Sequence, residues 1–496
     1  MLPSGTNMYT LLTGATGLVG RYLVRDLLLN GHNLAVVVRG SRKMSAYDRM
    51  EQIMQHWEAE LGRQLPRPVV IVGDISQAGF DFSEEDRDWV KDNVNTIIHS
   101  AAILEFYGED REGEPWRTNL GGTRNMIQLC RDLQITDIHY VSTAYVAGIQ
   151  DEPVMEDSLD SGQSFRNDYE ESKFLAEKEV REIDFAEHVT VYRPAVISGD
   201  SITGYTNTYH GIYLYLRLMA LIIPAQPADE NGIRHTPVRL KMTGDETRNI
   251  IPVDWISAVT VRLFETQEAR GGTYHMAPDN PMTSGNMVRW CSEYYKSTGT
   301  TFCGHDFDPV EDRSVDEDQY MFEQMLRDNM GTYEPYERTD NVFDMTQMKK
   351  FAGDIVCPDI DRTIMHRYLD YGNDDKWGKR KIPHPQVDTN VADMLETDRN
   401  AGETVSVGLD VSGPGGGSFT LHLGTAGLGG VDRGLRADNA ATVRLTTEEL
   451  VQALEQPESD ASLLAKYVDV EDTDLRNDIA TRILAGVGQA SEVGAQ

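Results

Sequence analysis

The sequence predicts an α/β fold of the Rossmann type, a doubly wound parallel sheet with a small substrate lobe, followed by a C-terminal α+β domain. Three observations predict it. Over the first two hundred residues, short apolar runs alternate with segments of helical periodicity, as expected for parallel strands covered by helices on both faces. A glycine-rich segment, Leu11–Gly20, joins the first run to the first helix. After about Gly199 the alternation weakens, and beyond residue 400 the pattern changes character.

The apolar runs of the first part predict six strands, which are Tyr9–Thr13, Leu34–Val38, Val69–Val72, Thr96–His99, Ile138–Ser142 and Val189–Arg193. Helical periodicity is clearest over Leu18–Leu29 and Thr123–Leu133, and strands return at Ile250–Val253 and Thr273–Met276. We therefore expect one domain over residues 1–375. Its core comes from about 1–200 and 250–278, and its substrate lobe comes from 200–250 and 279–375. Ligands of such sheets bind at the carboxyl ends of the strands.

A polar stretch that contains prolines, residues 376–399, predicts a linker. A small α+β domain is then expected over residues 400–496, with strands at Thr404–Asp410 and Ser418–Leu423 and a helix at Thr446–Gln456. Thr446 as N-cap and Glu449 three residues later have the spacing of a capping box. The change of pattern across the linker indicates a separate domain.

Composition excludes several classes of protein. The 46 Lys and Arg residues are outnumbered by 80 Asp and Glu, and a formal net charge of -34 disfavours nucleic acid as a partner. The four cysteines lack CxxC spacing, and Cys303 with His305 is at most half of a metal site, so no metal is expected. The longest apolar run, Ile212–Ile223, contains Arg217 and is too short to span a bilayer. Because the first predicted strand begins at Tyr9, we expect no signal peptide before the fold. The expected protein is therefore soluble and cytoplasmic.

The glycine-rich segment has the residues that a dinucleotide site needs. Gly14 permits the tight turn, Gly17 lets the backbone approach a pyrophosphate, and Gly20 lets the helix pack on the strand. The free N–H groups of the helix N-terminus then face the phosphates. Because a strand precedes the motif and a helix follows it, we predict that a nucleotide binds here.

Residues at the ends of the next strands indicate which nucleotide. Arg39 lies nineteen residues after Gly20, where an acidic side chain would bind the ribose of NAD and an arginine suits a 2′-phosphate. Arg42 and Lys43 add positive charge, so NADPH is favoured. The residues predicted to contact the cofactor are Gly14, Thr16, Gly17, Leu18, Val19, Gly20, Arg39, Arg42, Asp74, Ile75, Ser100, Ala101, Ala102, Tyr169, Lys173, Pro194 and Val196.

Three residues are predicted to be catalytic. Tyr169 and Lys173 are four residues apart in a helical segment and therefore share a face. An ammonium beside a phenol favours the phenolate, which would lower the pKa of Tyr169 for general acid–base work. Thr143 follows the fifth predicted strand and faces the same crevice, where its hydroxyl can hold a carbonyl oxygen. The order of glycine motif, strand-end hydroxyl and YxxxK makes a strong joint signal.

With these motifs, residues 1–375 resemble the extended short-chain dehydrogenase/reductases. The resemblance implies Thr143, Tyr169 and Lys173 as the catalytic trio, with Lys173 also touching the nicotinamide ribose. Members of the family often use an asparagine in a proton relay, and Asn119, before Gly121-Gly122-Thr123, matches that position, although a structural role is favoured for it. Many members also form dimers, so a homodimer is implied.

The segments Val141–Gly148 and Tyr192–Gly204 resemble the thioester-reductase and fatty acyl-CoA reductase branch, and Arg248–Asp254 fits the same branch. The implied reaction is the reduction of a long-chain acyl thioester, bound to CoA or to a carrier, to an aldehyde and then an alcohol. Tyr169 would be the general acid. The segment Ile212–Ile223 either lines an acyl channel or forms the core of the lobe.

Two other functions stay open. An NAD(P)-dependent hydroxysteroid or sugar-nucleotide dehydrogenase or epimerase is the enzymatic alternative, although the YGP-like signature of the sugar enzymes is absent. A protein that binds NADP(H) without turnover would typically lack Tyr169 or Lys173. The C-terminal domain weakly resembles a sterol-carrier-protein-like fold, through Ala441–Leu450, that would hold a lipid chain beside the reductase. Its alternative is a dimerisation or solubility appendage.

Overall fold

The computed structural model describes residues 8–308, 312, 314–395, 404–424, 428–454 and 461–487. Its centre is a seven-stranded parallel sheet in the order β11-β6-β5-β4-β1-β2-β3. The strands are β1 (Tyr9–Thr13), β2 (Leu34–Val38), β3 (Val69–Val72), β4 (Val94–His99), β5 (Asp137–Val141), β6 (His188–Pro194) and β11 (Thr273–Met276). The predicted doubly wound sheet is therefore confirmed. The strand order reverses between β1 and β4, and a crevice for ligands opens at such a point.

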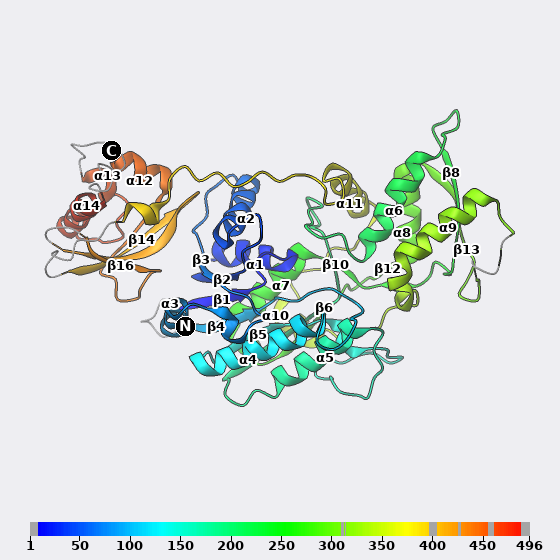
Figure 1. Cartoon of the computed structure of the whole chain (residues 1–496), viewed down its shortest axis with the longest axis horizontal. Coiled ribbons are helices and arrows are strands. Elements are labelled where there is room, and N and C mark those ends of the chain that lie inside the picture. Colours follow the sequence, from blue (N-terminus) through cyan, green and yellow to red (C-terminus); the bar gives the residue numbers. More distant parts are fainter. Residues whose placement is uncertain are drawn as a thin grey trace.

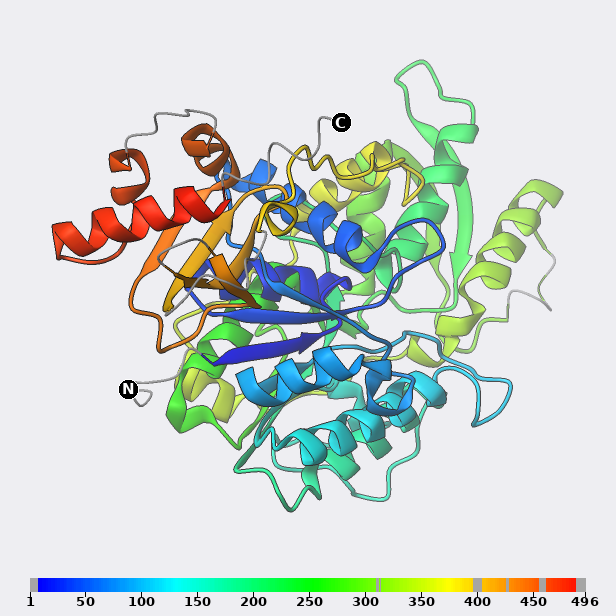
Figure 2. The same cartoon turned by 60° about the vertical axis from the view of Figure 1, so that its left-hand side comes forward.

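Helices cover both faces of this sheet (Figure 2). One face buries apolar side chains against α1 (Leu18–Leu29), α2 (Ala46–Leu61) and α7 (Val253–Glu265). The other face packs on α3 (Glu84–Asn93), α4 (Gly122–Leu133) and α5 (Asp168–Arg181). Because both faces are covered, the central strands are apolar along their whole length, which is the pattern that predicted them.

The substrate lobe lies at the end of the molecule toward which the strands of the sheet point, on the right of Figure 1. It contains three two-stranded pairs, β7 (Val196–Ser198) with β10 (Ile250–Pro252), β9 (Thr247–Arg248) with β12 (Met282–Thr283), and β8 (Arg234–Leu240) with β13 (Ser297–Phe302). Its helices are α6 (Ile212–Ala225), α8 (Ser284–Tyr295), α9 (Glu317–Met330) and α11 (Arg362–Asp374), which share one apolar core. A further helix, α10 (Thr346–Ala352), packs on the cluster around α7 and β11.

Predicted and observed bounds differ by a residue or two at several strands. The fifth strand begins at Asp137, which pairs with His188, and ends at Val141 instead of Ser142. Val253 was expected to end a strand but begins α7, with Pro252 in extended conformation as its N-cap. Proline has no N–H to continue a ladder, so the strand stops there and a helix can start.

The C-terminal part is an α+β unit with a mixed sheet in the order β16-β15-β14-β17. The strands are β14 (Val405–Ser412), β15 (Gly417–Leu423), β16 (Leu428–Arg433) and β17 (Thr442–Thr446), and the helices are α12 (Thr447–Leu454), α13 (Ser462–Ala465) and α14 (Thr473–Val487). The predicted capping box is present, because Glu449 N donates to Thr446 Oγ1 at 3.1 Å and Thr446 N donates to Glu449 Oε2 at 2.8 Å. The predicted last residues of this helix, through Gln456, lie outside the described residues.

The C-terminal unit packs on the amino ends of the central strands, at the left of Figure 1. Leu435 N donates to the hydroxyl of Tyr9, the first residue of β1, at 2.7 Å, and Trp89 Nε1 donates to Arg433 O at 2.7 Å. The chain that leads to it runs along α2, where Gln52 Nε2 donates to Pro383 O at 3.0 Å. The sterol-carrier interpretation expected the unit to hold a lipid chain beside the reductase site. The unit instead contacts the sheet at the end opposite to the carboxyl ends of the strands, where ligands of such sheets bind.

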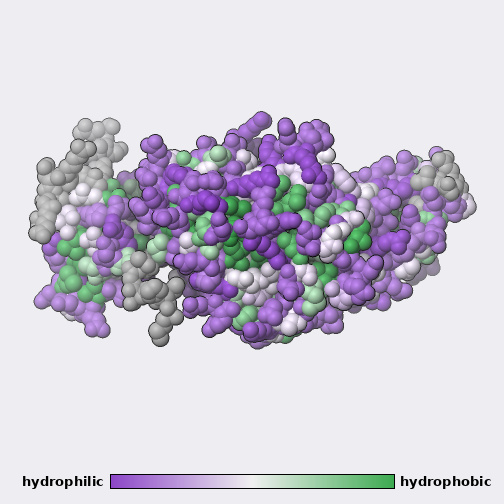
Figure 3. Space-filling model, turned by 90° about the horizontal axis from the view of Figure 1, so that it is seen from below, coloured by the Kyte–Doolittle hydropathy of each residue, from purple (hydrophilic) through white to green (hydrophobic). Residues whose placement is uncertain are grey.

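The visible surface in Figure 3 is mostly hydrophilic, with apolar residues in the middle of that face and at its left end. Among the described residues, no helix is both long enough and apolar enough to cross a bilayer.

Candidate active site

A cavity of about 900 Å³ joins the glycine-rich turn to the substrate lobe. Twelve of the predicted site residues line it, and they are Gly14, Gly17, Leu18, Val19, Gly20, Ser100, Ala102, Thr143, Tyr169, Lys173, Pro194 and Val196. They come from the carboxyl ends of β1, β4, β5 and β6, from β7 and from α1 and α5, so the topology gathers residues that are far apart in the sequence. The predicted residues Thr16, Arg39, Arg42, Asp74, Ile75 and Ala101 lie outside this lining.

The glycine motif has the shape that a dinucleotide requires. Gly14 has a φ of +78°, and a Cβ on Gly20 would lie 2.0 Å from Gly14 O, so neither position accepts a side chain. A Cβ on Gly17 would meet only Gly14 O, at 3.3 Å, and would otherwise extend into the cavity that Gly17 lines. Gly14 thus permits the turn and Gly20 the close packing of α1, whereas Gly17 borders open space.

Arginines surround the outer end of this turn. Arg39 is exposed and forms an ion pair with Asp74, with Nη1 3.1 Å from Oδ2. Arg49, on α2, donates from Nη2 to Thr16 Oγ1 at 3.1 Å and from Nη1 to Arg39 O. Burial and the neighbouring charges of Arg39 and Arg21 lower the pKa of Arg49. Arg49 was not predicted to lie at the site. The signal that could have found it is its place as a further arginine near the start of the helix that follows Arg39, in a chain that is otherwise acidic.

The other peripheral residues have local roles. Asp74 Oδ1 accepts from Ser76 N at 3.0 Å and Ser76 Oγ at 2.8 Å, and these bonds and Arg39 hold its pKa low against the opposing effect of burial. Ala101 N donates to Thr13 Oγ1 at 3.3 Å, which fixes the turn after β4 beside Gly14. Ile75 contacts Gly122 at the start of α4.

Tyr169 and Thr143 are neighbours at the centre of the cavity. Burial raises the pKa of Tyr169 to about 12, and a hydrogen bond with Thr143 opposes this rise. The Thr143 hydroxyl also donates to Pro194 O at 3.3 Å, so its direction is fixed from β6. The phenol is therefore fully protonated near neutral pH in the protein alone, and the expected lowering of its pKa by Lys173 is absent.

The reason is the position of Lys173. Its side chain is 2% exposed, and Nζ donates to the Tyr140 hydroxyl at 3.0 Å and to Val141 O at 2.9 Å. Burial lowers the pKa of Lys173 to about 7, while Glu177 opposes the shift. The side chain of Lys173 thus extends from α5 to β5 and not along the helix to Tyr169.

Asn119 has a structural position. Its amide accepts from Ile103 N at 2.9 Å and donates to Ile103 O at 3.1 Å and to Ser172 Oγ at 3.3 Å. These bonds fasten the loop after β4 to the start of α4, next to α5. The hydrogen-bonding capacity of the side chain is used in this way, which agrees with the structural role that its sequence context favoured.

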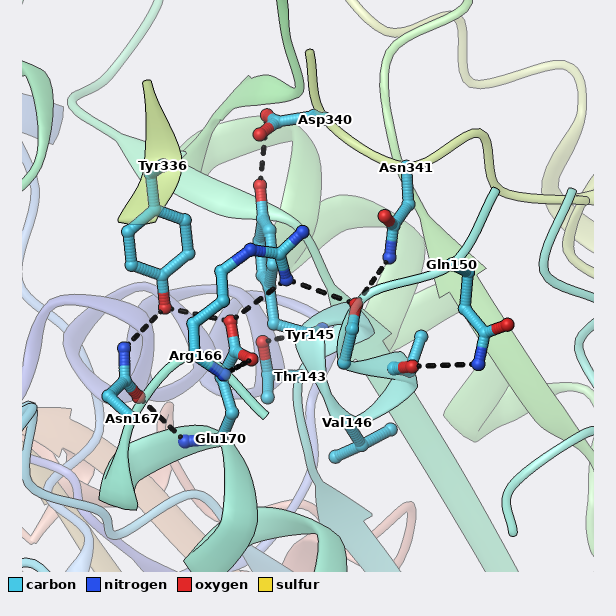
Figure 4. Close-up of polar contacts among 12 residues, drawn as sticks. Thr143, Tyr145, Val146, Gln150, Arg166, Asn167, Glu170, Tyr336, Asp340 and Asn341 are labelled. Carbon is cyan, nitrogen blue, oxygen red and sulfur yellow. Dashed lines mark hydrogen bonds and ion pairs between the residues drawn. The ribbon is translucent and has the colours of Figure 1, made fainter. Parts of the chain in front are cut away.

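A segment of the lobe is tied to the start of the α5 helix (Figure 4). The Tyr336 hydroxyl, in the turn Gly331–Tyr336, donates to Glu170 Oε1 at 2.8 Å and accepts from Asn167 Nδ2 at 2.8 Å. Glu170 is completely buried and forms an ion pair with Arg166. The residue before it in the chain is Tyr169, so this network holds the segment over the cavity beside the phenol.

Aromatic, aliphatic and charged side chains line the rest of the cavity. Phe106, Tyr333 and Tyr336 form a cluster in which Phe106 is 6.2 Å from Tyr169 between ring centroids. Toward the lobe the lining combines aliphatic and charged side chains. The aliphatic ones include Ile212, Leu240, Ile250, Met287, Leu326 and Met330, and the charged ones include Arg239, Lys241, Arg248, Glu323, Arg327 and Glu334. Only the first turn of α6 faces the cavity, whereas Leu216, Leu218, Met219, Ile222 and Ile223 are buried in the lobe core. The segment Ile212–Ile223 therefore lines the cavity with its first turn and forms part of the lobe core with the rest.

Within the described ranges, no group of three or more His, Cys, Asp or Glu side chains is placed to hold a metal ion. His305 forms an ion pair with Glu246, with Nε2 3.0 Å from Oε1, and Cys303 is exposed.

Residues 12–260 match the family model described as male sterility protein. Over 153 residues the chain is 34% identical to the Drosophila melanogaster protein named "Putative fatty acyl-CoA reductase", a match that covers 29% of each chain. It is 25% identical over 374 residues to a linear gramicidin synthase of Brevibacillus parabrevis, covering 73% of this chain and 7% of that protein. It is 25% identical over 393 residues to an aldehyde reductase of Aspergillus flavus, covering 73% and 35%. The chain matches about a third or less of the length of these relatives.

Two solved structures show the same fold. The terminal R domain from the myxalamid biosynthetic pathway superposes with a TM-score of 0.60 and 24% identity, covering 78% of this chain and 94% of that one. A UDP-glucuronic acid 4-epimerase from Bacillus cereus in complex with NAD gives a TM-score of 0.51 and 16% identity, covering 75% and 99%.

Proposed function

The chain belongs to the male sterility protein family, in the thioester-reductase branch of the extended short-chain dehydrogenases/reductases, and from this membership we propose that it is an NADPH-dependent reductase of acyl thioesters. The observation that carries the proposal is the single cavity that joins the glycine motif, the Thr143–Tyr169–Lys173 trio and an aliphatic lobe. A nicotinamide cofactor and an acyl chain can enter it from opposite ends.

The residues at the glycine end fit the cofactor. Gly17 provides the space for the pyrophosphate, and the N-terminus of α1 offers N–H groups to it. Arg39 and Arg49 provide positive charge beside Thr16, which supports NADPH over NADH. Lys173 would hold the nicotinamide ribose through its hydroxyls. When bound, NADPH supplies the hydride that reduces the carbonyl carbon of the thioester.

The chain contributes a proton and the stabilisation of negative charge. In our proposal, the Tyr169 hydroxyl donates to the carbonyl oxygen as it gains charge. The Thr143 hydroxyl, which donates to Pro194 O in the free protein, turns to donate to the same oxygen. Cleavage of the carbon–sulfur bond then yields an aldehyde and a thiol, and the thiolate takes up one proton. A second round of reduction, with Tyr169 as the general acid, would convert the aldehyde into an alcohol.

The aliphatic end of the cavity supports a long acyl chain as the substrate. Leu240, Ile250 and Met287 offer dispersion contacts to such a chain. Each buried methylene group stabilises such a complex by ~0.8 kcal/mol. We therefore expect KM to fall with chain length until the lobe is filled.

The test uses the full chain with NADPH and acyl-CoAs of two to eighteen carbons, and follows NADPH absorbance and aldehyde release. We expect turnover that improves with chain length. Tyr169→Phe should reduce kcat by about 10²- to 10⁴-fold and leave the Kd for NADPH unchanged. Tyr294→Phe removes a hydroxyl bonded to Asp370 in the lobe and serves as the matched control. Absence of NADPH oxidation with every thioester, together with turnover of a hydroxysteroid or a sugar nucleotide by NAD(P)⁺, would replace this proposal with the alternative.

A further inference from the structure

A fully buried polar group in the sheet below the cavity is the Tyr140 hydroxyl. Tyr140 is on β5 and is 0% exposed, and its hydroxyl accepts from Lys173 Nζ at 3.0 Å. Nothing in the order of motifs required a tyrosine at this point of a buried strand. A hydroxyl placed against a buried ammonium therefore needs an explanation in terms of that ammonium.

The hydroxyl is part of a continuous buried chain of hydrogen bonds. Thr123 Oγ1 lies 3.4 Å from the Tyr140 hydroxyl and donates to Asn119 O at 2.6 Å. The Tyr140 hydroxyl can thus accept from Lys173 and donate to Thr123, so that each polar atom of the chain is satisfied. The side-chain amide of Asn119 is directed elsewhere, to Ile103 and Ser172.

The other charged and titratable groups near Lys173 leave the ammonium dependent on this hydroxyl. Glu177, on the same helix, raises the pKa of Lys173, but it is shared with Arg193 of β6, Arg181 and Ser142. His99 of β4 stacks on the Tyr140 ring with centroids 5.9 Å apart, and burial lowers its pKa to about 3, so it is neutral. Tyr169, one helical turn before Lys173, is neutral as well.

We propose that Tyr140, and not Asn119, is the positioning residue for Lys173, and that its hydroxyl keeps the lysine charged and directed toward the cofactor site. This inference rests on the proposed function, in which Lys173 holds the nicotinamide ribose. In the free protein the hydroxyl and Val141 O hold Nζ at the sheet. The ammonium still has a third N–H available for a ribose hydroxyl.

The physical consequence is a dependence on pH. A neutral acceptor stabilises the ammonium over the amine, so its removal lowers the pKa of Lys173 further below its usual range. Loss of one hydrogen bond to the ammonium should change its protonation equilibrium about tenfold, which lowers the pKa of Lys173 by about one unit. Binding of NADPH and turnover, which need the ammonium, would then fail at a lower pH in the variant.

The experiment compares Tyr140→Phe with Tyr192→Phe in the full chain. Tyr192 is a matched control because it is equally buried on the adjacent strand and its hydroxyl is bonded to His139 Nδ1 at 2.7 Å. The Kd for NADPH is measured by cofactor fluorescence from pH 6 to 10, and the pH profile of kcat/KM is measured with an acyl-CoA. Tyr140→Phe should shift the pH at which NADPH affinity falls downward by about one unit, and Tyr192→Phe should not shift it.

Equal profiles for Tyr140→Phe and the wild type would overturn the proposal, even if the variant melts at a lower temperature. A shift in Asn119→Ala of the same size would also overturn it, because the asparagine would then be the residue that acts on Lys173. If Tyr140→Phe does not fold, Tyr140→Met removes the same hydroxyl and must give the same shift. The binding readout needs no thioester, so failure of the proposed substrate class leaves this test intact.

Discussion

Arg193 Nη2 lies 2.7 Å from Glu177 Oε1, and the two side chains are 1% and 0% exposed. Arg193 is the residue before the last one of β6, and Glu177 is on α5 one turn beyond Lys173. This ion pair therefore fixes the helix that carries Tyr169 and Lys173 to the sheet. Ser142 Oγ, next to Thr143, also donates to Glu177 Oε2 at 2.6 Å. The pair therefore joins three elements of the site through one carboxylate.

Removal of one partner should strongly destabilise the fold. Arg193→Leu leaves a buried carboxylate without its main counter-ion, and we expect the free energy of unfolding to fall by about 3–5 kcal/mol. Chemical denaturation followed by circular dichroism measures this change. Arg124→Leu breaks the exposed pair with Glu179 and should cost ~1 kcal/mol or less. If the two variants were equally stable, the buried pair would have no special part in holding α5.

The glycine motif allows cofactor binding to be separated from folding. Gly17→Ala adds a methyl group that points into the cavity, so we expect a stable protein with at least about tenfold weaker binding of NADPH, or ~1.4 kcal/mol. Gly20→Ala places the same methyl group 2.0 Å from Gly14 O and should prevent α1 from packing on β1. Thermal melting with and without NADPH distinguishes them. Gly17→Ala with normal NADPH affinity would show that the pyrophosphate does not lie over this residue.

Selectivity for the 2′-phosphate should depend on Arg39 and Arg49 together. We expect the double variant Arg39→Ala/Arg49→Ala to bind NADPH about 10²-fold more weakly, because each charge-assisted hydrogen bond to a phosphate contributes ~1.5–3 kcal/mol. Binding of NADH should change by less than about twofold. Isothermal titration with both cofactors measures the ratio. Arg87→Ala, which breaks an exposed pair with Asp132 away from the site, is the control. An equal loss for the two cofactors would assign these arginines to the shared part of the nucleotide.

Local patterns were sufficient to predict most of the sheet and much of the candidate site. The bounds of β1, β2, β3, β11 and α1 agree with the prediction to the residue. These elements are governed by their own burial periodicity and by the turn that Gly14 permits. Thr143, Tyr169 and Lys173 could be placed at one crevice because parallel topology gathers the carboxyl ends of the strands.

Features that depend on tertiary contacts could not be predicted in the same way. The direction of Lys173 toward Tyr140 depends on the distance between α5 and β5, which no motif encodes. Tyr336 reaches Glu170 from 166 residues away in the sequence. The position of the C-terminal unit depends on contacts such as Trp89 with Arg433, which involve surface residues without periodicity.

The buried ammonium of Lys173 should make the protein less stable than its packing allows. The pKa of Lys173 is lowered from 10.5 to about 7, so between these values the unfolded chain binds more protons than the folded one. The contribution of Lys173 to the free energy of unfolding therefore rises with pH between these two values. At pH 7 we expect the free energy of unfolding of Lys173→Met to be ~1–4 kcal/mol higher than that of the wild type, because a buried charge is replaced by an apolar side chain of similar length. Denaturation at pH 7 and pH 10 measures both effects.

The gain in Lys173→Met should be larger at pH 7 than at pH 10, because the wild-type lysine is already neutral in the fold at the higher pH. Lys178→Met, five residues on, replaces an exposed lysine paired with Asp160 and should change stability by ~1 kcal/mol or less at either pH. A loss of stability at pH 7 in Lys173→Met would mean that the bonds to Tyr140 and Val141 outweigh the desolvation of the ammonium. The site would then hold Lys173 as a structural anchor and not as a strained functional group.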